Sequence, residues 1–316
     1  MKLIRDLEHL AEPFCGGVVS IGNFDGVHLG HTQIARRLVA TARRLGGPAV
    51  VFTFDPHPSR ILRPESAPMP LCRTQRKAEL LAELGVDAVL AYPTDQALLQ
   101  LDARQFFDRI VRGRLDAKAI VEGPNFLFGR NRSGNIEVLR QFCTEAAVAL
   151  EVVEPVEIAG QVVSSSRIRE SILAGQVEQA RWLLGRPYGI RGTVVRGAGR
   201  GAKLGYPTAN VGQIDTLLPA PGIYAGAALA EGSQWPAAIS LGPNPTFDEG
   251  RLKVEAYLIG YQGFLYDQTI TVDFFARLRD IERFDSIDRL VAQMGRDVAA
   301  ALRIAAEDNP TTAVSR

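Results

Sequence analysis

The chain has 316 residues, a length that suits two domains, each able to bury a core of its own. Hydrophobic residues make up 46% of it and charged residues 22%, which excludes a disordered chain and is typical of a globular protein. The net charge of +1 excludes a global attraction to nucleic acid or to an anionic membrane, so any phosphate site has to be local.

The N-terminal residues 1–10 are charged and contain no apolar segment of the signal-peptide type, and no apolar run approaches membrane-spanning length. Cys15, Cys72 and Cys143 are isolated and lack metal-ligand spacing, so we expect reduced core thiols. The sequence therefore predicts a cytoplasmic protein without a membrane or nucleic-acid partner. It leaves the oligomeric state open.

The first predicted strand, residues 18–21, leads through a glycine-rich turn into a helix predicted over residues 32–45. The turn, residues 22–31, reads Gly-Asn-Phe-Asp-Gly-Val-His-Leu-Gly-His. Glycines let the main chain approach a ligand closely, and a helix N-terminus presents unpaired N–H groups and a positive dipole end to phosphate. This turn is therefore a candidate phosphate site. The alternative is an ordinary loop in which glycine serves turn geometry only.

Two histidines, His28 and His31, stand three residues apart in this turn, on one face of a helix that begins there. Two imidazole donors above a helix N-terminus can hold the charge that develops on phosphorus during a displacement. The turn offers no Ser or Cys nucleophile. Direct transfer between bound substrates is therefore favoured over a covalent intermediate.

Strands and helices alternate through the rest of the first half. Strands are predicted at residues 49–54, 87–91, 118–122 and 151–154, and helices at 74–84 and 98–111. This order predicts a parallel sheet with right-handed crossovers, which binds ligands at the carboxyl ends of its strands. His57 follows one such end, in Asp-Pro-His-Pro, where a ligand role and a rigid structural turn are equally compatible with the sequence.

The strand at 118–122 ends in a long loop, residues 123–134, with glycines, two arginines and two phenylalanines. Such a composition can stack on a ring and contact phosphate, and the alternative is a solvated basic turn. Asn125 in this loop can form hydrogen bonds but cannot transfer a proton.

Three serines, Ser164 to Ser166, precede a helix predicted from Ser166 onward. Serines at a helix start can be caps and then need no ligand. Arg167 and Arg169 add positive charge that a cap does not require, which favours phosphate binding.

After a short helix predicted at residues 176–184, the hydrophobic pattern changes from helical to alternating, which places a domain boundary near residue 185. Alternating runs such as 189–195 and 268–274 predict strands. An amphipathic helix is predicted at residues 286–305, and residues 308–316 are expected to form a frayed tail.

A second glycine-rich stretch, residues 192–210, contains three basic residues and can fold around phosphates, although it is neither a Walker loop nor a clean dinucleotide fingerprint. Thr208 and Asn210, two apart on an extended segment, point to one side, and their oxygens suit Mg²⁺. The alternative is a flexible basic hairpin. Glu255 is a carboxylate in an otherwise apolar strand, where it suits a general base, but a solvent-facing position fits the alternation equally well.

These motifs resemble those of bacterial FAD synthetases, which combine a riboflavin kinase with an FMN adenylyltransferase of the HxGH nucleotidyltransferase branch. In the first half the resemblance rests on residues 22–31, 54–58, 123–134 and 164–169. In the second half it rests on Leu-Gly-Tyr-Pro-Thr-Ala-Asn at 204–210, on Val-Glu-Ala-Tyr-Leu at 254–258, and on residues 221–225, 242–247 and 278–284. The family usually has Asp where this chain has Asn125.

The resemblance implies an α/β fold with a Rossmann-like HxGH nucleotidyltransferase domain, residues 1–185, and a riboflavin-kinase β-barrel with a closing helix, residues 186–316. It implies that the barrel phosphorylates riboflavin to FMN with ATP and Mg²⁺. The first domain then transfers AMP from a second ATP to FMN, which gives FAD and pyrophosphate. ATP, riboflavin and FMN are the implied small-molecule partners, and Mg²⁺ is the implied cofactor.

The same resemblance implies the site residues. His28 and His31 are the implied catalytic pair of the adenylyltransferase. Its implied nucleotide-binding residues are Gly22, Asn23, Phe24, Asp25, Gly26, Gly30, Asn125, Ser164, Ser165, Ser166, Arg167 and Arg169. In the kinase, Glu255 is the implied base that takes the proton of the terminal ribityl hydroxyl. Its implied nucleotide- and flavin-binding residues are Gly197, Gly199, Gly201, Lys203, Gly205, Tyr206, Pro207, Thr208 and Asn210, with Thr208 and Asn210 as metal ligands.

Two alternatives to a bifunctional enzyme are open: an enzyme with one competent half, and a flavin-binding regulator that uses the barrel as a sensor. The presence of His28, His31 and Glu255 argues against the sensor, which needs none of them.

Overall fold

The computed structural model describes residues 1–5, 14–244, 246 and 249–308 of the chain. Contacts divide the chain into two compact units, Met1–Ser165 and Ser166–Arg316. This division falls before the boundary expected near residue 185. The expected tail lies outside the described residues from residue 309 on. No helix in the described ranges is both long and apolar enough to cross a membrane.

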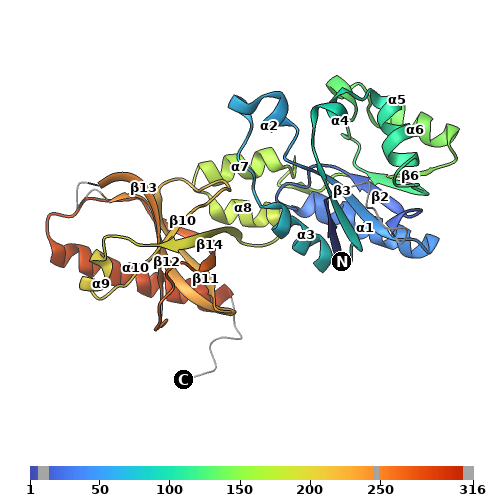
Figure 1. Cartoon of the computed structure of the whole chain (residues 1–316). Coiled ribbons are helices and arrows are strands. Elements are labelled where there is room, and N and C mark those ends of the chain that lie inside the picture. Colours follow the sequence, from blue (N-terminus) through green and yellow to red (C-terminus); the bar gives the residue numbers. More distant parts are fainter. Residues whose placement is uncertain (6–13, 245, 247–248, 309–316) are drawn as a thin grey trace. The chain divides into compact units, whose positions relative to one another are not determined.

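The first unit contains a six-stranded parallel sheet with helices against it (Figure 1). Its strands are β1 (Lys2–Ile4), β2 (Val18–Ile21), β3 (Ala49–Asp55), β4 (Ala88–Pro93), β5 (Ala119–Glu122) and β6 (Ala149–Val152). They lie in the order β1-β4-β3-β2-β5-β6, and all neighbouring strands are parallel. Because β3 lies on one side of β2 and β5 on the other, the chain order reverses at β2. The expected Rossmann-like sheet is confirmed.

Within residues 1–5 and 14–165, six α-helices belong to this sheet and its connections. They are α1 (Leu29–Leu45), α2 (Ser59–Leu62), α3 (Thr74–Glu83), α4 (Gln96–Gln100), α5 (Ala103–Phe106) and α6 (Ile136–Glu145). Further helical segments are η2 (Pro64–Ser66), η3 (Phe107–Arg112), which directly follows α5, and η4 (Arg130–Arg132). A small hairpin pairs β7 (Glu157–Ile158) with β8 (Gln161–Val162).

The prediction of one continuous helix over residues 98–111 is wrong, because the helical conformation is interrupted between α4 and α5. The Asp102 side chain accepts from the Gln105 N–H at 2.8 Å, and the Gln105 side chain accepts from the Asp102 N–H at 3.1 Å. This capping box starts a new helix in the middle of the apolar pattern. The last strand lies two residues earlier than the predicted 151–154, and the sequence did not predict β1 or α6.

The sheet carries a hydrophobic cluster on each face. Val19 and Ile21 of β2 pack with Phe107 in one cluster, whereas Val18 packs with Leu38 of α1 in the other. This alternation buries β2 on both sides, as expected for a central parallel strand. It fixes the strand from which the glycine-rich turn leaves.

The second unit is built on a closed antiparallel barrel (Figure 1). Its strands are β9 (Tyr188–Val195), β10 (Ala209–Gly212), β11 (Gly222–Ala230), β12 (Ser233–Asn244), β13 (Glu249–Leu258) and β14 (Thr269–Arg279). They follow the order β10-β13-β12-β11-β14-β9, and pairing of β9 with β10 closes the ring. Its helices are α7 (Ser165–Leu173), α8 (Val177–Leu184), α9 (Arg200–Lys203) and α10 (Ile287–Asp308), of which α10 packs on β11, β12 and β14. The expected barrel with a following helix is confirmed.

Candidate functional sites

The glycine-rich turn joins β2 to α1, as predicted. Phe24 (φ 47°), Gly26 (φ 81°) and Val27 (φ 39°) take left-handed backbone conformations. Such a conformation is strained for Val27, whose side chain is β-branched. Phe24 and Val27 are both buried in the cluster that contains Leu38. Packing therefore holds the turn in a shape that an isolated peptide would avoid.

The structure brings the predicted histidine pair together at the start of α1. His28 is the N-cap, and its Nδ1 accepts from the His31 N–H at 3.4 Å. The two imidazole rings stack with centroids 3.7 Å apart, and the Phe24 ring lies 4.9 Å from that of His31. A Cβ on Gly30 would come within 3.2 Å of the His28 ring. Glycine at this position therefore leaves room for the stacked pair.

Asp25, predicted to bind nucleotide, fastens the turn to the rest of the unit. Its buried carboxylate accepts from the N–H groups of Leu71 at 3.0 Å and Cys72 at 3.4 Å. The Ser165 hydroxyl donates to the Asp25 carbonyl at 2.9 Å. These contacts give Asp25 a structural role that the sequence did not indicate, and they tie Ser165 to the same turn.

A buried lysine lies behind the turn. Lys77 on α3 is 6% exposed, and its ammonium donates to Thr53 Oγ1 at 3.2 Å. The Thr53 hydroxyl in turn donates to the Asn23 carbonyl at 3.1 Å, and Asn23 Oδ1 is buried without a hydrogen bond among the described residues. Sequence reasoning missed Lys77. The available signal was its position beside apolar residues of the predicted helix, such as Ala78, which is buried.

Glu122 ends β5 beside β2 and was predicted only as part of a strand. Its Oε1 accepts from the Ile21 N–H at 2.5 Å and from the Ser20 hydroxyl at 3.3 Å. Burial raises the pKa of this carboxyl well above its usual value, and the two hydrogen bonds oppose the rise.

The loop at residues 123–134 only partly fits its expected role. Phe128 is buried in the core, and the Phe126 ring stacks on it with centroids 5.3 Å apart. The stacking interpretation is therefore wrong for Phe128, and it stays a prediction for Phe126. Asn125 is exposed.

The two remaining motifs of the first half, residues 54–58 and 164–169, lie at the N-termini of helices α2 and α7. His57 Nδ1 accepts from the Ser59 N–H at 3.1 Å at the start of α2, which agrees with the structural alternative for that nitrogen. Ser165 begins α7, one residue before the predicted start. Arg167 and Arg169 are half-buried in its first turns, and Ser166 is exposed.

A cavity of about 210 Å³ lies in the barrel unit, bordered by the second glycine-rich stretch, β10, β13 and α10. Its lining includes the predicted residues Gly197, Gly199, Gly201, Tyr206, Pro207, Thr208, Asn210 and Glu255. Among the described residues, Lys203 and Gly205 are exposed and do not belong to this lining. The structure thus gathers most of the predicted kinase residues around one space.

Strand register explains why Asn210 and Glu255 meet there, and Thr208 directly precedes β10. Asn210 on β10 is the direct partner of Glu255 on β13. Val254 and Ala256 are buried on the other side of β13, so the half-buried Glu255 alternates with them and lines the cavity. The alternative of a strand carboxylate that faces bulk solvent is therefore wrong.

The glycines at residues 197 and 201 let this stretch close over the strand. A Cβ on Gly197 would lie 2.3 Å from the Asn210 side-chain nitrogen. A Cβ on Gly201 would lie 2.4 Å from the Tyr206 carbonyl oxygen and 3.3 Å from Thr208 Oγ1. A side chain at residue 197 would collide with Asn210, and one at residue 201 would collide with the main chain of Tyr206.

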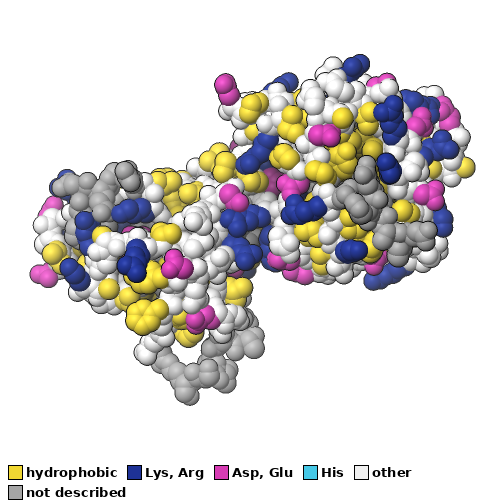
Figure 2. Space-filling model, viewed as in Figure 1, with side chains coloured by type: hydrophobic (Ala, Val, Ile, Leu, Met, Phe, Trp, Pro, Cys, Tyr) yellow, Lys and Arg dark blue, Asp and Glu magenta, His cyan; other side chains and the backbone are white. Residues whose placement is uncertain are grey.

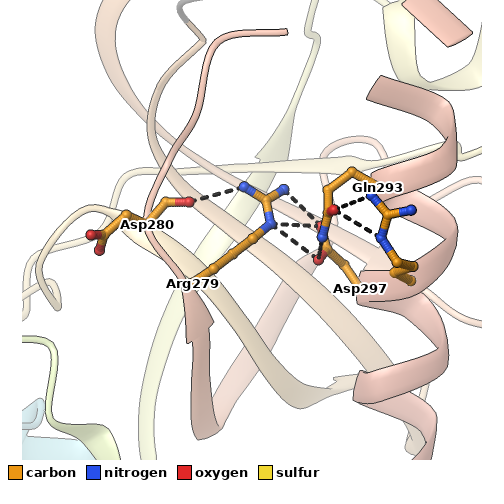
Figure 3. Close-up of polar contacts among 5 residues, drawn as sticks. Arg279, Asp280, Gln293 and Asp297 are labelled. Atoms are coloured by element: carbon orange, nitrogen blue, oxygen red, sulfur yellow. Dashed lines mark hydrogen bonds and ion pairs between the residues drawn. The ribbon is translucent and has the colours of Figure 1, made fainter. Parts of the chain in front are cut away.

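An ion pair that the prediction did not include borders the same cavity (Figure 3). Arg279 at the end of β14 contacts Asp297 on α10, and the Gln293 amide donates to Asp297 Oδ1 at 2.8 Å. The Arg279 Nη1 also donates to the Asp280 carbonyl at 2.9 Å. This network ties the closing helix to the barrel.

Basic and acidic side chains are interspersed over both units on the face drawn in Figure 2. This distribution agrees with the net charge of +1.

Comparison with known proteins gives matches in both units. The family model of FAD synthetase matches residues 11–167, and that of riboflavin kinase matches residues 184–305. The bifunctional riboflavin kinase/FMN adenylyltransferase of Pseudomonas fluorescens is 37% identical over 97% of this chain and 98% of its own. The protein of the same name from Escherichia coli K12 is 34% identical over 95% and 97%. A crystal structure titled as a macrolide-efflux protein from Streptococcus pneumoniae has a TM-score of 0.85 at 31% identity, with 95% and 97% covered. The chain belongs to the family of bifunctional riboflavin kinases/FMN adenylyltransferases.

Proposed function

We infer that this chain makes FAD in two steps. It phosphorylates riboflavin to FMN with ATP, and it then transfers AMP from ATP to FMN, with release of pyrophosphate. Family membership supports both activities. The observation that carries the site assignment is the meeting of Thr208, Asn210 and Glu255 at one cavity under a glycine-rich stretch.

We assign the adenylyltransferase to residues 1–185 and the kinase to residues 186–316. The two family matches, to residues 11–167 and 184–305, support this division of labour. Most of α7 and α8 lies between the two matches, and residues 166–184 belong by contacts to the barrel unit. Their assignment to the adenylyltransferase rests on the serine and arginine residues at the start of α7.

In the kinase, Glu255 accepts the proton of the terminal ribityl hydroxyl as that oxygen attacks the γ-phosphorus of ATP. The new O–P bond replaces the bond to the β-phosphate oxygen, and ADP leaves. The half-buried position of Glu255 at the cavity suits a base that must reach its substrate and stay shielded from bulk water. The glycine-rich stretch supplies backbone N–H groups to the phosphates.

The donor set at this cavity fits Mg²⁺. Thr208 and Asn210 offer a hydroxyl and an amide oxygen, the hard ligands that Mg²⁺ prefers. No group of three or more His, Cys, Asp or Glu side chains in the described part of the chain could hold a metal by itself. A site of few protein ligands is what Mg²⁺ needs when substrate phosphates and water complete its shell. When bound, the ion would neutralise charge on the transferred phosphoryl group.

In the adenylyltransferase, a phosphate oxygen of FMN attacks the α-phosphorus of ATP, and the bond to pyrophosphate breaks. Because the attacking phosphate is already ionised, the step needs no general base, and the turn, which offers no Ser or Cys nucleophile, suits direct transfer between the bound substrates. His28 and His31 stabilise the charge on phosphorus from the start of α1. Residues 22–26, Gly30 and Asn125 hold nucleotide, and Ser164 to Arg169 hold the departing pyrophosphate.

The test is to incubate pure protein with riboflavin and ATP, with and without Mg²⁺, and to separate the flavins. We expect FMN and then FAD, in the presence of Mg²⁺ only. FMN alone would indicate an enzyme with one competent half, and unchanged riboflavin would indicate a flavin-binding regulator. We further propose a cytoplasmic location, which the three free cysteines support.

A further inference from the structure

We propose that Glu122 is a positioning residue of the adenylyltransferase site, where its side chain holds the glycine-rich turn against the loop at residues 123–134. This inference rests on the proposed adenylyltransferase function of the first unit. No step of that reaction uses Glu122, and its contacts lie between the two segments predicted to hold nucleotide.

The first argument is the strand pairing around Glu122. β2 and β5 pair at Val18 with Ala119 and at Val19 with Ile120, and the register ends there. Beyond this point Gly22 N–H still reaches across to β3, where it donates to the Phe52 carbonyl at 3.0 Å. The Ile21 N–H faces the other side and donates to the Glu122 carboxyl. The side chain thus takes the place of a backbone carbonyl where the two strands separate.

The second argument is the place in the sheet where the Glu122 side chain replaces a backbone carbonyl as acceptor. The strands that follow β2 in sequence lie on both of its sides, β3 on one side and β5 on the other, so the direction of strand order reverses at β2. In open α/β sheets, ligands bind at such a point, outside the carboxyl ends of the strands. Ile21 is the last residue before the turn, and Gly123 after Glu122 begins the second loop. One carboxyl therefore links the starting points of both loops.

The third argument is that Glu122 is itself held firmly. It is 4% exposed, and its main-chain carbonyl accepts from the Val153 N–H at 2.8 Å, which ties it to the end of β6. Ser20, which donates to the same carboxyl oxygen, is fully buried. The link between the loops therefore has little freedom to move, and it fixes the point from which the chain runs to His28.

The experiment compares two variants that separate reach from charge. Glu122→Gln keeps the acceptor oxygen at full reach but cannot ionise, whereas Glu122→Asp can still ionise and withdraws the acceptor by one methylene. If Glu122 acts by position, the Gln variant keeps at least about half of kcat for FMN adenylylation. The Asp variant loses about tenfold in kcat, with a smaller change in the KM for ATP, because misplacement by about 1 Å can cost up to 100-fold.

Two controls make the result decisive. Riboflavin phosphorylation by the same chain should stay unchanged in both variants, and Glu154→Gln, an exposed carboxylate just past β6, should leave both reactions unchanged. An inactive Gln variant beside an active Asp variant would assign the role to charge and overturn the proposal. Equal activity of both variants, or equal loss in both, would overturn it as well. A wild-type protein that makes no FAD from FMN would instead refute the adenylyltransferase function itself.

Discussion

Arg279 and Asp297 form a two-pronged ion pair between the last barrel strand and the closing helix. The Arg279 Nη2 lies 2.8 Å from Asp297 Oδ2, and its Nε lies 3.1 Å and 3.2 Å from the two carboxylate oxygens (Figure 3). The two side chains are only 17% and 10% exposed. Paired geometry of this kind is stronger than a single contact, and it is shielded from solvent screening.

The change Asp297→Ala should therefore destabilise the barrel unit by about 3 kcal/mol, because it leaves the Arg279 guanidinium without its carboxylate in a poorly solvated place. Tryptophan fluorescence during denaturant unfolding measures this effect, since Trp182 and Trp235 both belong to the second unit. The matched control is Asp285→Ala, whose ion pair with Arg289 is exposed at both ends and should change stability by less than about 0.5 kcal/mol. Equal effects of the two changes would contradict this ranking.

Glu255→Gln should lower the rate of riboflavin phosphorylation by at least about 100-fold, because the amide cannot accept the ribityl proton. Conversion of added FMN to FAD should continue, since the groups that act on phosphorus in that reaction are assigned to the glycine-rich turn of the first unit. Chromatography of the flavins after incubation with riboflavin or with FMN gives both rates. Loss of both reactions in a folded variant would contradict the assignment of two separate sites.

The control for this change is Glu231→Gln. Glu231 is an exposed carboxylate of the same barrel that accepts from Tyr261 at 3.1 Å. We expect its replacement to leave both rates within about twofold of the wild type. A large effect there would mean that loss of any barrel carboxylate impairs the kinase.

His28→Asn separates the chemical role of His28 from its role as a helix cap. Asn is among the best N-cap residues, so α1 should keep its start. The variant should nevertheless lose about 100-fold or more in FMN adenylylation, because the imidazole donor is gone. His28→Ala should lose the same activity and in addition about 1 kcal/mol of stability.

Riboflavin phosphorylation in the same samples reports whether the chain is intact. An Asn variant with full adenylyltransferase activity would show that His28 serves only as a cap. Adenylyltransferase activity in the Asn variant together with its loss in the Ala variant would likewise show that His28 serves only as a cap.

The fold was largely predictable because most of its strands and helices have a hydrophobic pattern that is recognisable within the segment itself. Buried parallel strands such as β2 and β3 are continuous apolar runs, and α10 has one apolar stripe, so each was found close to its true bounds. The start of α1 at Leu29 was missed by three residues, because its cap is His28 rather than one of the usual Ser, Thr, Asp or Asn residues. The break at Asp102 was missed because apolar spacing continues across it.

That residues of the candidate sites lie together was predictable where a motif is contiguous in sequence, as for His28 with His31 and for Thr208 with Asn210. The missed residues act through partners far along the chain. Glu122 contacts Ile21, 101 residues away, and no period or spacing carries that information. The pairing of Asn210 with Glu255 is likewise set by the closure of the barrel, so only the structure distinguishes the cavity from the solvent face for Glu255.

The raised pKa of Glu122 predicts how the stability of the first unit changes with pH. Because burial raises this pKa in the folded chain above the usual 4.5, the folded state binds the proton more tightly than the unfolded state does. The stabilisation is therefore complete below about pH 4.5, and it is lost as pH rises toward the folded pKa.

Relative to Glu122→Gln, which does not titrate, the wild type should thus lose stability as pH rises from about 4.5 toward the raised pKa of Glu122, by at most about 1.4 kcal/mol per pH unit. Hydrogen exchange of a peptide that contains Ile21 measures this, because its amide donates to the titrating group. The exposed Glu154→Gln should show a constant difference from the wild type over the same range. A constant difference for Glu122→Gln too would mean that the buried carboxyl does not take up its proton in this range, and its hydrogen bonds would then outweigh the cost of burial.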